Sequence, residues 1–306
     1  MITNNPYQDR ISKEGIIIKG NRECSSRYKS ILPILARYNK YAPLKILDFG
    51  ANYGYFSLRL LNDFPFADIT MVDYEPLLKE VYQENKVKNL HLINKFMDIE
   101  DIEELGKENQ YDIILCMSVL HHFKEYKKVI DLFLKMGKIV IFEVGYPEEK
   151  PVSNQSRVKP IYDYLMTKQP IQVNQWIQHD RPIFYLNKDE ICLKGVVRNG
   201  CGIAGKKTFK EIETQIVQRF KYKMYHGTLN ITLDNPVTFK NESKLAVFYN
   251  IFPCFICGLP VWNIRPEVRN CPTPYMELMS PFKLRDFFNL EDNNIINIGV
   301  NRAYLN

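Results

Sequence analysis

Short apolar runs alternate with amphipathic stretches over the first half of the chain. The first run, LKILDFG, is followed by ADITMVD, NLHLINKFMD, YDIILCMSV and GKIVIFEVG. Stretches such as LLKEVYQENK and YKKVIDLFLKM separate these runs, and after Gly54 the side chains of Phe56, Leu60 and Phe64 share one helical face. Buried strands that alternate with helices are typical of a parallel, doubly wound sheet. The pattern therefore predicts an α/β Rossmann-like domain.

The pattern changes twice further along the chain. Residues 146–192 begin with YPEEKPVSNQSRVKP, a polar and proline-rich stretch that predicts a loop. From residue 193 onwards, short runs such as YHGTLNITLD and LAVFYNIFPCFICGLPVWNI are separated by turns, and the alternation with helices stops. A chain of 306 residues also exceeds the usual size of a single core. We therefore expect an α/β domain over residues 1–145, an extension or connection over 146–192, and a mostly β domain over 193–306.

Composition and charge narrow the class of protein. No stretch approaches the roughly 20 apolar residues of a transmembrane helix, and the N-terminus lacks a basic segment followed by an apolar one. Seven irregularly spaced cysteines fit a reducing compartment, so we expect a cytoplasmic protein. Cys254 and Cys257 form a CxxC pair, which alone is weak evidence for a metal or redox site. The net charge of +6, with lysines scattered among acids, slightly favours anionic ligands and does not indicate a specific nucleic-acid partner.

Polar residues and glycines gather where the predicted strands end. Parallel sheets bind ligands at the carboxyl ends of their strands, so these residues are candidates for binding. Glycines allow a tight turn and a close approach to a ligand, and a carboxylate at the end of the second strand can accept hydrogen bonds from ribose hydroxyls. A dinucleotide fold is the competing interpretation, but the G-x-G-x-x-G motif is absent here. The strand-end candidates are Asp48, Gly50, Asn52, Gly54, Asp73 and Asp98.

Four segments in this half resemble a known family. LKILDFGANYGYFSL, MVDYEP, FMDIED and YDIILCMSVLHHF are similar to the successive motifs of class I S-adenosylmethionine-dependent methyltransferases, over about residues 44–145. More narrowly, SVLHHF and the later HDRPIFYL resemble the methyltransferase half of the kinase-methyltransferases that terminate bacterial O-antigen chains. The resemblance implies S-adenosylmethionine as cofactor. It implies as cofactor-binding residues Asp48, Gly50, Asn52, Gly54, Asp73, Asp98 and Ser118.

Two of the five histidines, His121 and His122, stand together after the fourth predicted strand. In the resembled fold this strand end lies beside the transferred methyl group. A hydroxyl acceptor needs a base, and a neutral imidazole suits that role near pH 7; a phosphate acceptor instead needs orientation and charge neutralisation, which an imidazolium or Arg181 could supply. We therefore predict catalytic roles for His121, His122 and Arg181, with His122 slightly preferred of the pair. The alternative is that one histidine caps the next helix or packs under the cofactor, and no third ligand with identifiable spacing supports a metal site.

The C-terminal part resembles a second family. GVVRNGCGIAG, GTLNITL and MELMSPFKLRDFFNLEDNNIINI are similar, in this order, to the motifs of the archaeal CTP-dependent riboflavin kinases, over about residues 193–300. The resemblance implies a riboflavin-kinase-like cradle-loop barrel that uses CTP and Mg²⁺, with Thr228 and Asn230 as magnesium ligands and Glu277 at the acceptor site. It implies as nucleotide-binding residues Gly200, Gly202, Gly205, Phe282, Lys283, Leu284 and Arg285.

The residues of these motifs suit phosphoryl transfer, which needs a phosphate cradle, a cation and an aligned hydroxyl. Glycines can expose backbone amides to phosphates, and Thr228 and Asn230 can face one magnesium ion from the same side of a strand. The chain also departs from the family: Ile203 and Ala204 replace an acid of the glycine loop, and His226 replaces a proline-like residue before GTLN. The stretch FYNIFPCFICGLPVWNIRPEVRNCP does not resemble the flavin pocket expected of that family. The resemblance therefore supports nucleotide binding by this chain better than it supports riboflavin as the acceptor.

The two resemblances together predict a bifunctional enzyme. A kinase that creates a phosphate and a methyltransferase that methylates it would act in sequence, on a small-molecule or glycan acceptor such as a sugar or polysaccharide end. One alternative is a methyltransferase whose barrel only binds its substrate, or a barrel without catalytic activity. Another is a regulatory module in which the barrel senses a nucleotide or a flavin.

Overall fold

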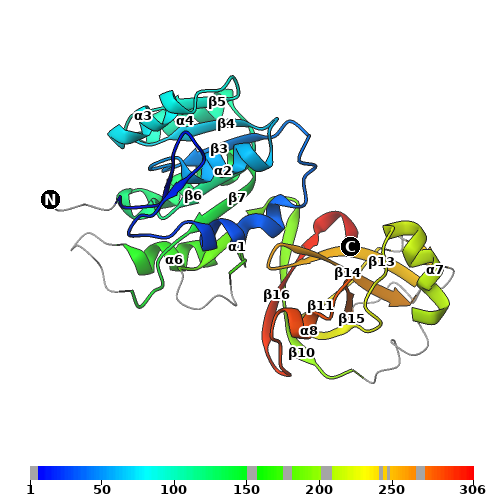
Figure 1. Ribbon diagram of the computed structural model, residues 1–306. Helices are drawn as coiled ribbons and strands as arrows, with labels where there is room; N and C mark the ends of the chain where they lie inside the picture. Colours follow the sequence, from blue (N-terminus) through cyan, green and yellow to red (C-terminus); the bar gives the residue numbers. More distant parts are fainter. Residues whose placement is uncertain are drawn as a thin grey trace. The chain divides into compact units, whose positions relative to one another are not determined.

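The computed structural model describes residues 6–149, 157–174, 181–200, 209–240, 244–246, 249–266 and 273–306. It divides the chain into two compact units, Met1–Lys188 and Asp189–Asn306, which are called unit 1 and unit 2 below. Figure 1 shows both units coloured along the sequence. Each unit has its own sheet and its own hydrophobic core.

Unit 1 is built on a seven-stranded sheet with the order β5-β4-β3-β6-β7-β9-β8 (Figure 1). Strands β3 to β7 run parallel, β9 pairs antiparallel with β7, and β8 pairs antiparallel with β9. Their bounds are β3 Lys45–Phe49, β4 Asp68–Val72, β5 Leu90–Ile93, β6 Tyr111–Met117, β7 Gly137–Glu143, β8 Ile171–Gln172 and β9 Ile183–Asn187. The central strands carry continuous apolar runs because parallel sheets are covered on both faces. The predicted Rossmann-like fold is confirmed.

The helices of unit 1 include those that the periodicity predicted, after Gly54 and within LLKEVYQENK and YKKVIDLFLKM. Their bounds are α1 Ser25–Leu35, α2 Tyr55–Asp63, α3 Pro76–Glu84, α4 Ile99–Glu108, the short 3₁₀ helix η1 Leu120–His122, α5 Tyr126–Met136 and α6 Val158–Met166. Helix α2 buries Phe56 and Leu60, two of the three side chains that the spacing placed on one face, and Phe64 is buried just after its end. A small hairpin of β1 Arg10–Ile11 and β2 Ile17–Ile18 precedes α1.

The segment that we expected to be an extension or connection, residues 146–192, contributes α6, β8 and β9 to unit 1. Helix α6 packs Ile161 and Leu165 into the same core as β6 and β7. Strand β9 covers the edge of β7, where Phe142 pairs with Phe184, and thereby satisfies backbone groups that an open edge would leave unpaired. Two short antiparallel strands carry too little periodicity to be recognised in the sequence, so the compact unit extends to Lys188.

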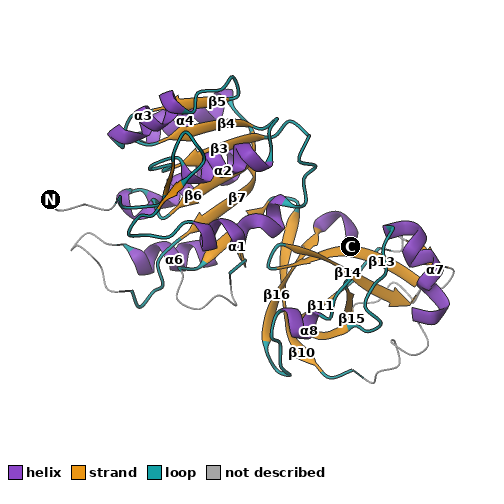
Figure 2. Ribbon diagram, in the orientation of Figure 1, coloured by secondary structure: helices purple, strands orange, loops and turns teal. Residues whose placement is uncertain are grey.

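Unit 2 is built mostly of strands (Figure 2). Its sheet has the order β12-β13-β14-β15-β11-β10-β16, and β13 also pairs with β16, so six antiparallel strands close into a barrel. The elements are β10 Glu190–Arg198, α7 Phe209–Phe220, β11 Leu229–Val237, β12 Lys244–Ala246, β13 Tyr249–Ile256, β14 Leu259–Pro266, β15 Thr273–Met279, α8 Leu284–Phe287, β16 Ile295–Asn301 and the 3₁₀ helix η3 Arg302–Tyr304. The expected small β-barrel is confirmed.

The CxxC pair lies in the interior of unit 2. Cys254 is on β13 and Cys257 is in the turn to β14, and both side chains are buried. Burial raises the pKa of the Cys254 thiol to about 12, which opposes the thiolate that metal binding and redox exchange require. Among the described residues, no group of three or more His, Cys, Asp or Glu side chains could hold a metal ion. Within the same residues, no helix has the length and apolar character needed to cross a membrane.

Barrel closure predicts a large loss of stability when a side chain at the β13–β16 seam is truncated. Ile298 is fully buried on β16 and pairs with Leu193 on one side and Ile256 on the other. Ile298→Ala should lower the free energy of unfolding by about 2–5 kcal/mol, because it leaves a cavity. Ile295→Ala, on the same strand but half exposed, should cost less than about 1 kcal/mol. Urea unfolding monitored by circular dichroism would compare them, and equal losses would contradict the closed barrel.

Candidate cofactor and nucleotide sites

A pocket of about 360 Å³ lies in unit 1 at the carboxyl ends of β3, β4, β5 and β6. Residues of these strand ends and of the N-terminal segment, residues 6–24, form its walls. They are Tyr7, Gln8, Arg22, Phe49, Gly50, Asn52, Val72, Asp73, Tyr74, Glu75, Lys95, Phe96, Met97, Met117, Ser118, Val119, His121, His122 and Phe123. Four predicted cofactor residues are thus brought together: Gly50, Asn52, Asp73 and Ser118.

The turn after β3 is shaped for close approach to a ligand. Gly50 has φ +83°, and a Cβ there would lie 1.9 Å from Cγ2 of Val119, so glycine is required. The backbone amide of Asn52 donates to Oδ2 of Asp73 over 2.8 Å, and the amide of Glu75 donates to Oδ1 over 3.0 Å. Each oxygen of Asp73 keeps a lone pair for a further donor. The carboxylate therefore holds the turn and lines the pocket at the same time.

Three predicted cofactor residues do not line this pocket. Asp48 is buried on β3 and accepts a hydrogen bond of 2.7 Å from the hydroxyl of Ser57, so it ties β3 to α2; burial raises its pKa to about 6. Asp98 is exposed and caps α4 by accepting from the amide of Asp101 over 2.9 Å. Gly54 begins α2 in a left-handed conformation, with φ +70°. Their strand-end positions matched the pattern, but their side-chain directions were decided by packing and capping.

The paired histidines occupy η1, directly after β6, and both line the pocket. Their ring centroids are 4.0 Å apart. His122 is exposed, whereas His121 is partly buried. Burial, followed by the charges of His122, Arg181 and Arg22, lowers the pKa of His121 to about 4, so that its imidazole is neutral at pH 7. The slight preference for His122 thus has no support in burial, because His121 is the more enclosed of the two.

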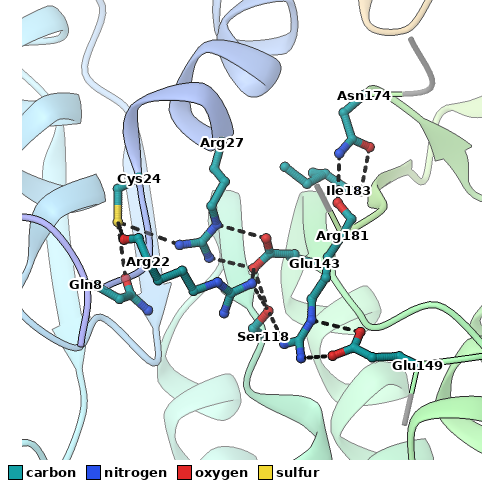
Figure 3. A network of polar contacts seen from close by, with 10 residues as sticks. All are labelled: Gln8, Arg22, Cys24, Arg27, Ser118, Glu143, Glu149, Asn174, Arg181 and Ile183. Carbon is teal, nitrogen blue, oxygen red and sulfur yellow. Dashed lines mark hydrogen bonds and ion pairs between the residues drawn. The ribbon is translucent and has the colours of Figure 1, made fainter. Parts of the chain in front are cut away.

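A buried ion-pair network connects the end of β7 to the N-terminal segment (Figure 3). Glu143 is 1% exposed and accepts two hydrogen bonds from Arg27, of 2.8 and 2.5 Å. Its Oε2 also lies 2.9 Å from Nη2 of Arg22 and accepts from the hydroxyl of Ser118 over 2.5 Å. Although burial opposes ionisation, the two arginines lower the pKa of Glu143. The carboxylate therefore stays charged and holds both arginines in place.

Arg181, a predicted catalytic residue, lies next to the pocket wall without being part of it. Its guanidinium forms a bidentate pair with Glu149, and Nη1 donates to the hydroxyl of Ser118 over 3.3 Å (Figure 3). Ser118 has φ +60°, a strained conformation for a residue other than glycine. Two arginines and Glu143 hold this serine, so Arg181 acts on the pocket through Ser118 and through its positive charge.

Sequence reasoning missed the contribution of the N-terminal segment. Arg22 lines the pocket and donates to Ser118 over 2.9 Å, although 96 residues separate them. Two polar atoms of residues that line the pocket, Nη1 of Arg22 and Oδ1 of Asn52, are buried and have no hydrogen-bond partner among the described residues. The wall also carries the carboxylate of Asp73, which fits the ribose hydroxyls of S-adenosylmethionine.

A second pocket, of about 710 Å³, lies in unit 2. Every predicted kinase residue that the structure describes lines this pocket. Gly202 and Gly205 lie outside the described residues. Thr228 and Asn230 face the pocket because Leu229 between them is buried. Glu277 stands opposite Asn230 in the β11–β15 ladder. The predicted residues that line it are Gly200, Thr228, Asn230, Glu277, Phe282, Lys283, Leu284 and Arg285.

The polar residues of this second pocket are close together. A Cβ on Gly200 would lie 2.2 Å from Nδ2 of Asn230, so the glycine segment passes directly over that amide. The pocket walls partly desolvate the Glu277 carboxyl and raise its pKa, although the residue is open to solvent on one side. Two cations are already engaged: Lys283 pairs with Asp286 over 2.9 Å, and Arg285 pairs with Asp292 over 2.8 Å.

Comparison with known proteins identifies one domain. Residues 47–138 match the family model described as a methyltransferase domain, so unit 1 contains a methyltransferase domain. A malonyl-[acyl-carrier protein] O-methyltransferase of Bacillus anthracis is 33% identical over 110 residues, 35% of this chain and 39% of that protein. Ribosomal RNA small subunit methyltransferase G of Streptococcus uberis is 25% identical over 171 residues, 55% of this chain and 72% of that protein. The chain therefore spans about two fifths of the first of these relatives.

Solved structures give a weaker likeness. The structure of the bifunctional kinase-methyltransferase WbdD matches with a TM-score of 0.47 and 15% identity, covering 86% of this chain and 63% of that chain. N-methyltransferase NodS from Bradyrhizobium japonicum, in complex with S-adenosyl-L-homocysteine, matches with a TM-score of 0.39 and 16% identity, covering 53% of this chain and 85% of that chain.

The surroundings of His121 predict a measurable pH effect. A histidine in an unfolded chain titrates near pH 6.5, whereas the pKa of His121 in the folded protein is about 4. Between these values the unfolded chain binds more protons, so His121 should make the folded protein less stable as the pH falls from 6.5 towards 4. NMR titration should show His121 neutral down to about pH 5, and His121→Gln should remove its share of the acid destabilisation. A titration midpoint near 6.5 would contradict the enclosed, electropositive environment.

Proposed function

We propose that unit 1 transfers a methyl group from S-adenosylmethionine to an acceptor bound beside His121 and His122. The observation that carries this proposal is the pocket at the carboxyl ends of β3 and β4, within a matched methyltransferase domain. Asp73 there has the position and the lone pairs to accept hydrogen bonds from the ribose hydroxyls. The bound cofactor supplies a sulfonium-activated methyl group. The chain supplies orientation of the acceptor and exclusion of water.

Aromatic residues fit the adenine end of this cofactor. Phe96 is exposed in the pocket wall, and its ring stacks on Phe123 with centroids 6.1 Å apart and an interplanar angle of 19°. Tyr74 meets Phe96 edge to face, also at 6.1 Å. Exposed aromatic rings beside a carboxylate would bind a flat base and an adjoining ribose together. We assign these rings to the adenine.

The charge around His121 supports an acceptor that is already anionic. A base with a pKa of about 4 is weak at pH 7, and general-base catalysis is most efficient when the pKa lies near the working pH. The neutral imidazole is therefore better suited to donate its N–H to the acceptor and orient it than to take up a proton from it. Arg22 and Arg181 meet at the hydroxyl of Ser118 and make this end of the pocket positive. A phosphate or carboxylate oxygen needs no base, and this end of the pocket would attract it.

We further propose that unit 2 is a CTP-dependent phosphotransferase that produces this phosphate. Thr228 and Asn230 would hold Mg²⁺, the segment at Gly200 would contact the phosphates, and Glu277 would take the proton of the attacking hydroxyl. The oxygen of that hydroxyl would form a bond to the terminal phosphorus of CTP, while the bond between this phosphorus and the leaving group, CDP, breaks. The raised pKa of Glu277 suits a proton acceptor. The sugar or polysaccharide end proposed as acceptor would then carry a methyl phosphate.

A second interpretation of unit 2 is supported by the ion pairs in its pocket. Lys283 and Arg285 are held by Asp286 and Asp292 and would have to leave them to bind phosphates. A barrel that binds substrate, or senses a nucleotide or flavin, would not need to release these cations. The expectations of a cytoplasmic protein and of an acceptor other than a specific nucleic acid stay predictions.

Asp73→Ala should weaken cofactor binding. Charge-assisted hydrogen bonds are worth about 1.5–3 kcal/mol each, so the affinity for S-adenosylhomocysteine should fall at least about tenfold. Asp98→Ala is the matched control: it should lose about 0.5–2 kcal/mol of stability, because α4 loses its cap, and leave the affinity unchanged. Titration calorimetry measures both affinities. Unchanged affinity in Asp73→Ala would refute the ribose assignment.

Asn230→Ala should separate the two activities. Loss of a magnesium ligand should abolish CTP turnover, while calorimetry should show unchanged binding of S-adenosylhomocysteine in unit 1. Asn235→Ala, exposed on the same strand and outside the pocket wall, should retain turnover. Mass spectrometry of a glycan pool incubated with CTP, Mg²⁺ and S-adenosylmethionine would detect added phosphate and methyl groups.

The same variant tests the order of the reactions. If the methyl group goes to the new phosphate, Asn230→Ala should not methylate an unphosphorylated acceptor and should methylate one that is supplied already phosphorylated. Methylation of the unphosphorylated acceptor at the normal rate would rule out the sequential mechanism. It would then leave a methyltransferase with an independent barrel.

A further inference from the structure

A partly exposed ion pair, Arg181 with Glu149, lies at the histidine end of the cofactor pocket, where Arg181 contacts Ser118 and both charges act on His121. We propose that Glu149 occupies the place of the methyl acceptor's anionic group, so that a phosphate monoester binds by replacing this carboxylate on Arg181. This inference rests on the methyl transfer proposed for unit 1. It assigns the choice of acceptor to a residue of the stretch that the sequence predicted only as a loop.

Arg181 is held in place by contacts that do not involve Glu149. Its backbone carbonyl accepts a hydrogen bond of 2.7 Å from the side-chain amide of Asn174, which is itself buried (Figure 3). Its Nη1 donates to the hydroxyl of Ser118 over 3.3 Å. Neither contact depends on the Glu149 carboxylate. The guanidinium is therefore ordered in advance, which reduces the entropic cost of binding an incoming anion.

Glu149 is held less firmly than its partner. Its amide donates to the carbonyl of Tyr146 over 2.9 Å, and among the described residues its carboxylate has no hydrogen-bond partner except Arg181. Oε2 accepts from Nε over 3.0 Å and Oε1 accepts from Nη2, while the two side chains are 26% and 28% exposed. A phosphate offers a guanidinium the same pair of acceptor oxygens. An anion can therefore take the place of the carboxylate without rearrangement of Arg181.

The charges at this end of the pocket match a dianion once Glu149 has moved away. Three guanidinium groups are linked there with two carboxylates: Arg22, Arg27 and Arg181 with Glu143 and Glu149. Withdrawal of Glu149 would leave two net positive charges, because Glu143 is buried and stays paired. A phosphate monoester carries about 1.5 to 2 negative charges at pH 7. A neutral hydroxyl acceptor could not compensate them and would leave Glu149 in place.

Methyl transfer would reverse this exchange. A phosphate oxygen forms a bond to the methyl carbon while the carbon–sulfur bond breaks, and the sulfur keeps the electron pair. The phosphate then carries one negative charge in place of two, so Arg181 binds it less strongly. Glu149 belongs to the same chain and competes for Arg181 at a high effective concentration. Its return to Arg181 would therefore favour release of the methylated product.

Methyl phosphate and dimethyl phosphate differ by one negative charge at about pH 7.5 and test the exchange. With S-adenosylhomocysteine bound, Glu149→Gln should bind methyl phosphate at least about tenfold more tightly than the wild type, by NMR titration of the histidine side chains. Dimethyl phosphate should gain less. The double variant Glu149→Gln, Arg181→Met should lose the gain. Glu104→Gln removes the same charge from an exposed pair with Lys107 on α4 and should leave both affinities within about twofold.

Each other outcome overturns the exchange. Equal binding of methyl phosphate by the wild type and by Glu149→Gln, or no binding by either, would show that Glu149 only clamps two loops together. An equal gain in Glu104→Gln would reduce the effect to net charge, and a gain that survives Arg181→Met would place the anion elsewhere. Calorimetry with S-adenosylhomocysteine separates the two proposals: if neither the wild type nor Glu149→Gln binds it, the methyltransferase proposal itself fails.

Discussion

The buried carboxylate of Glu143 organises the catalytic end of unit 1. It lies at the end of β7, is almost fully enclosed, and accepts from Arg27 of α1, from Arg22 of the N-terminal segment and from Ser118 after β6. Removing one partner of such a pair leaves an uncompensated buried charge, which typically costs about 3–5 kcal/mol. The Glu143 carboxylate therefore joins the sheet, helix α1 and the N-terminal segment. The positions of Ser118 and Arg22 depend on it.

The same charges govern the chemistry that we propose for the methyl acceptor. Burial, followed by the charges of His122 and of the arginines around Ser118, lowers the pKa of His121 and keeps its imidazole neutral, which makes it a weak base with one N–H to donate. An acceptor that arrives with its own negative charge compensates for the lack of a strong base. A phosphate made in unit 2 would have this property. The electrostatics of unit 1 thus agree with the phosphotransferase that we propose for unit 2.

In unit 2 the strand register of the barrel positions the polar residues of the pocket. Closure of six antiparallel strands into a barrel fixes the register of β11 against β15, and this register sets Asn230 opposite Glu277. Leu229 and Leu278 are buried, and Asn230 and Glu277 next to them both line the pocket. A one-residue slip would turn both polar side chains into the core. Burial of the apolar faces of β11 and β15 therefore orients their polar side chains towards the pocket.

The sequence by itself predicted the alternation of strands and helices in unit 1, the class of both units and part of the pocket at the strand ends. Apolar runs specify buried strands, and the glycine at position 50 and the acid at position 73 follow from what a tight turn and a strand end require. Asp48 and Asp98 stood at equivalent positions, but only the structure showed that one binds Ser57 inside the core and the other caps α4. Local pattern places a residue on an element and does not decide which way its side chain is used.

Only the tertiary structure brought the N-terminal segment to the pocket. Arg27 and Glu143 are 116 residues apart, and neither lies in a motif that suggests the other. Arg22 reaches Ser118 across 96 residues. Hydrophobic periodicity reports which face of an element is buried, because burial follows from local spacing. The partner of a buried charge depends on which strand ends the fold brings together, so it is decided by the folded sheet as a whole.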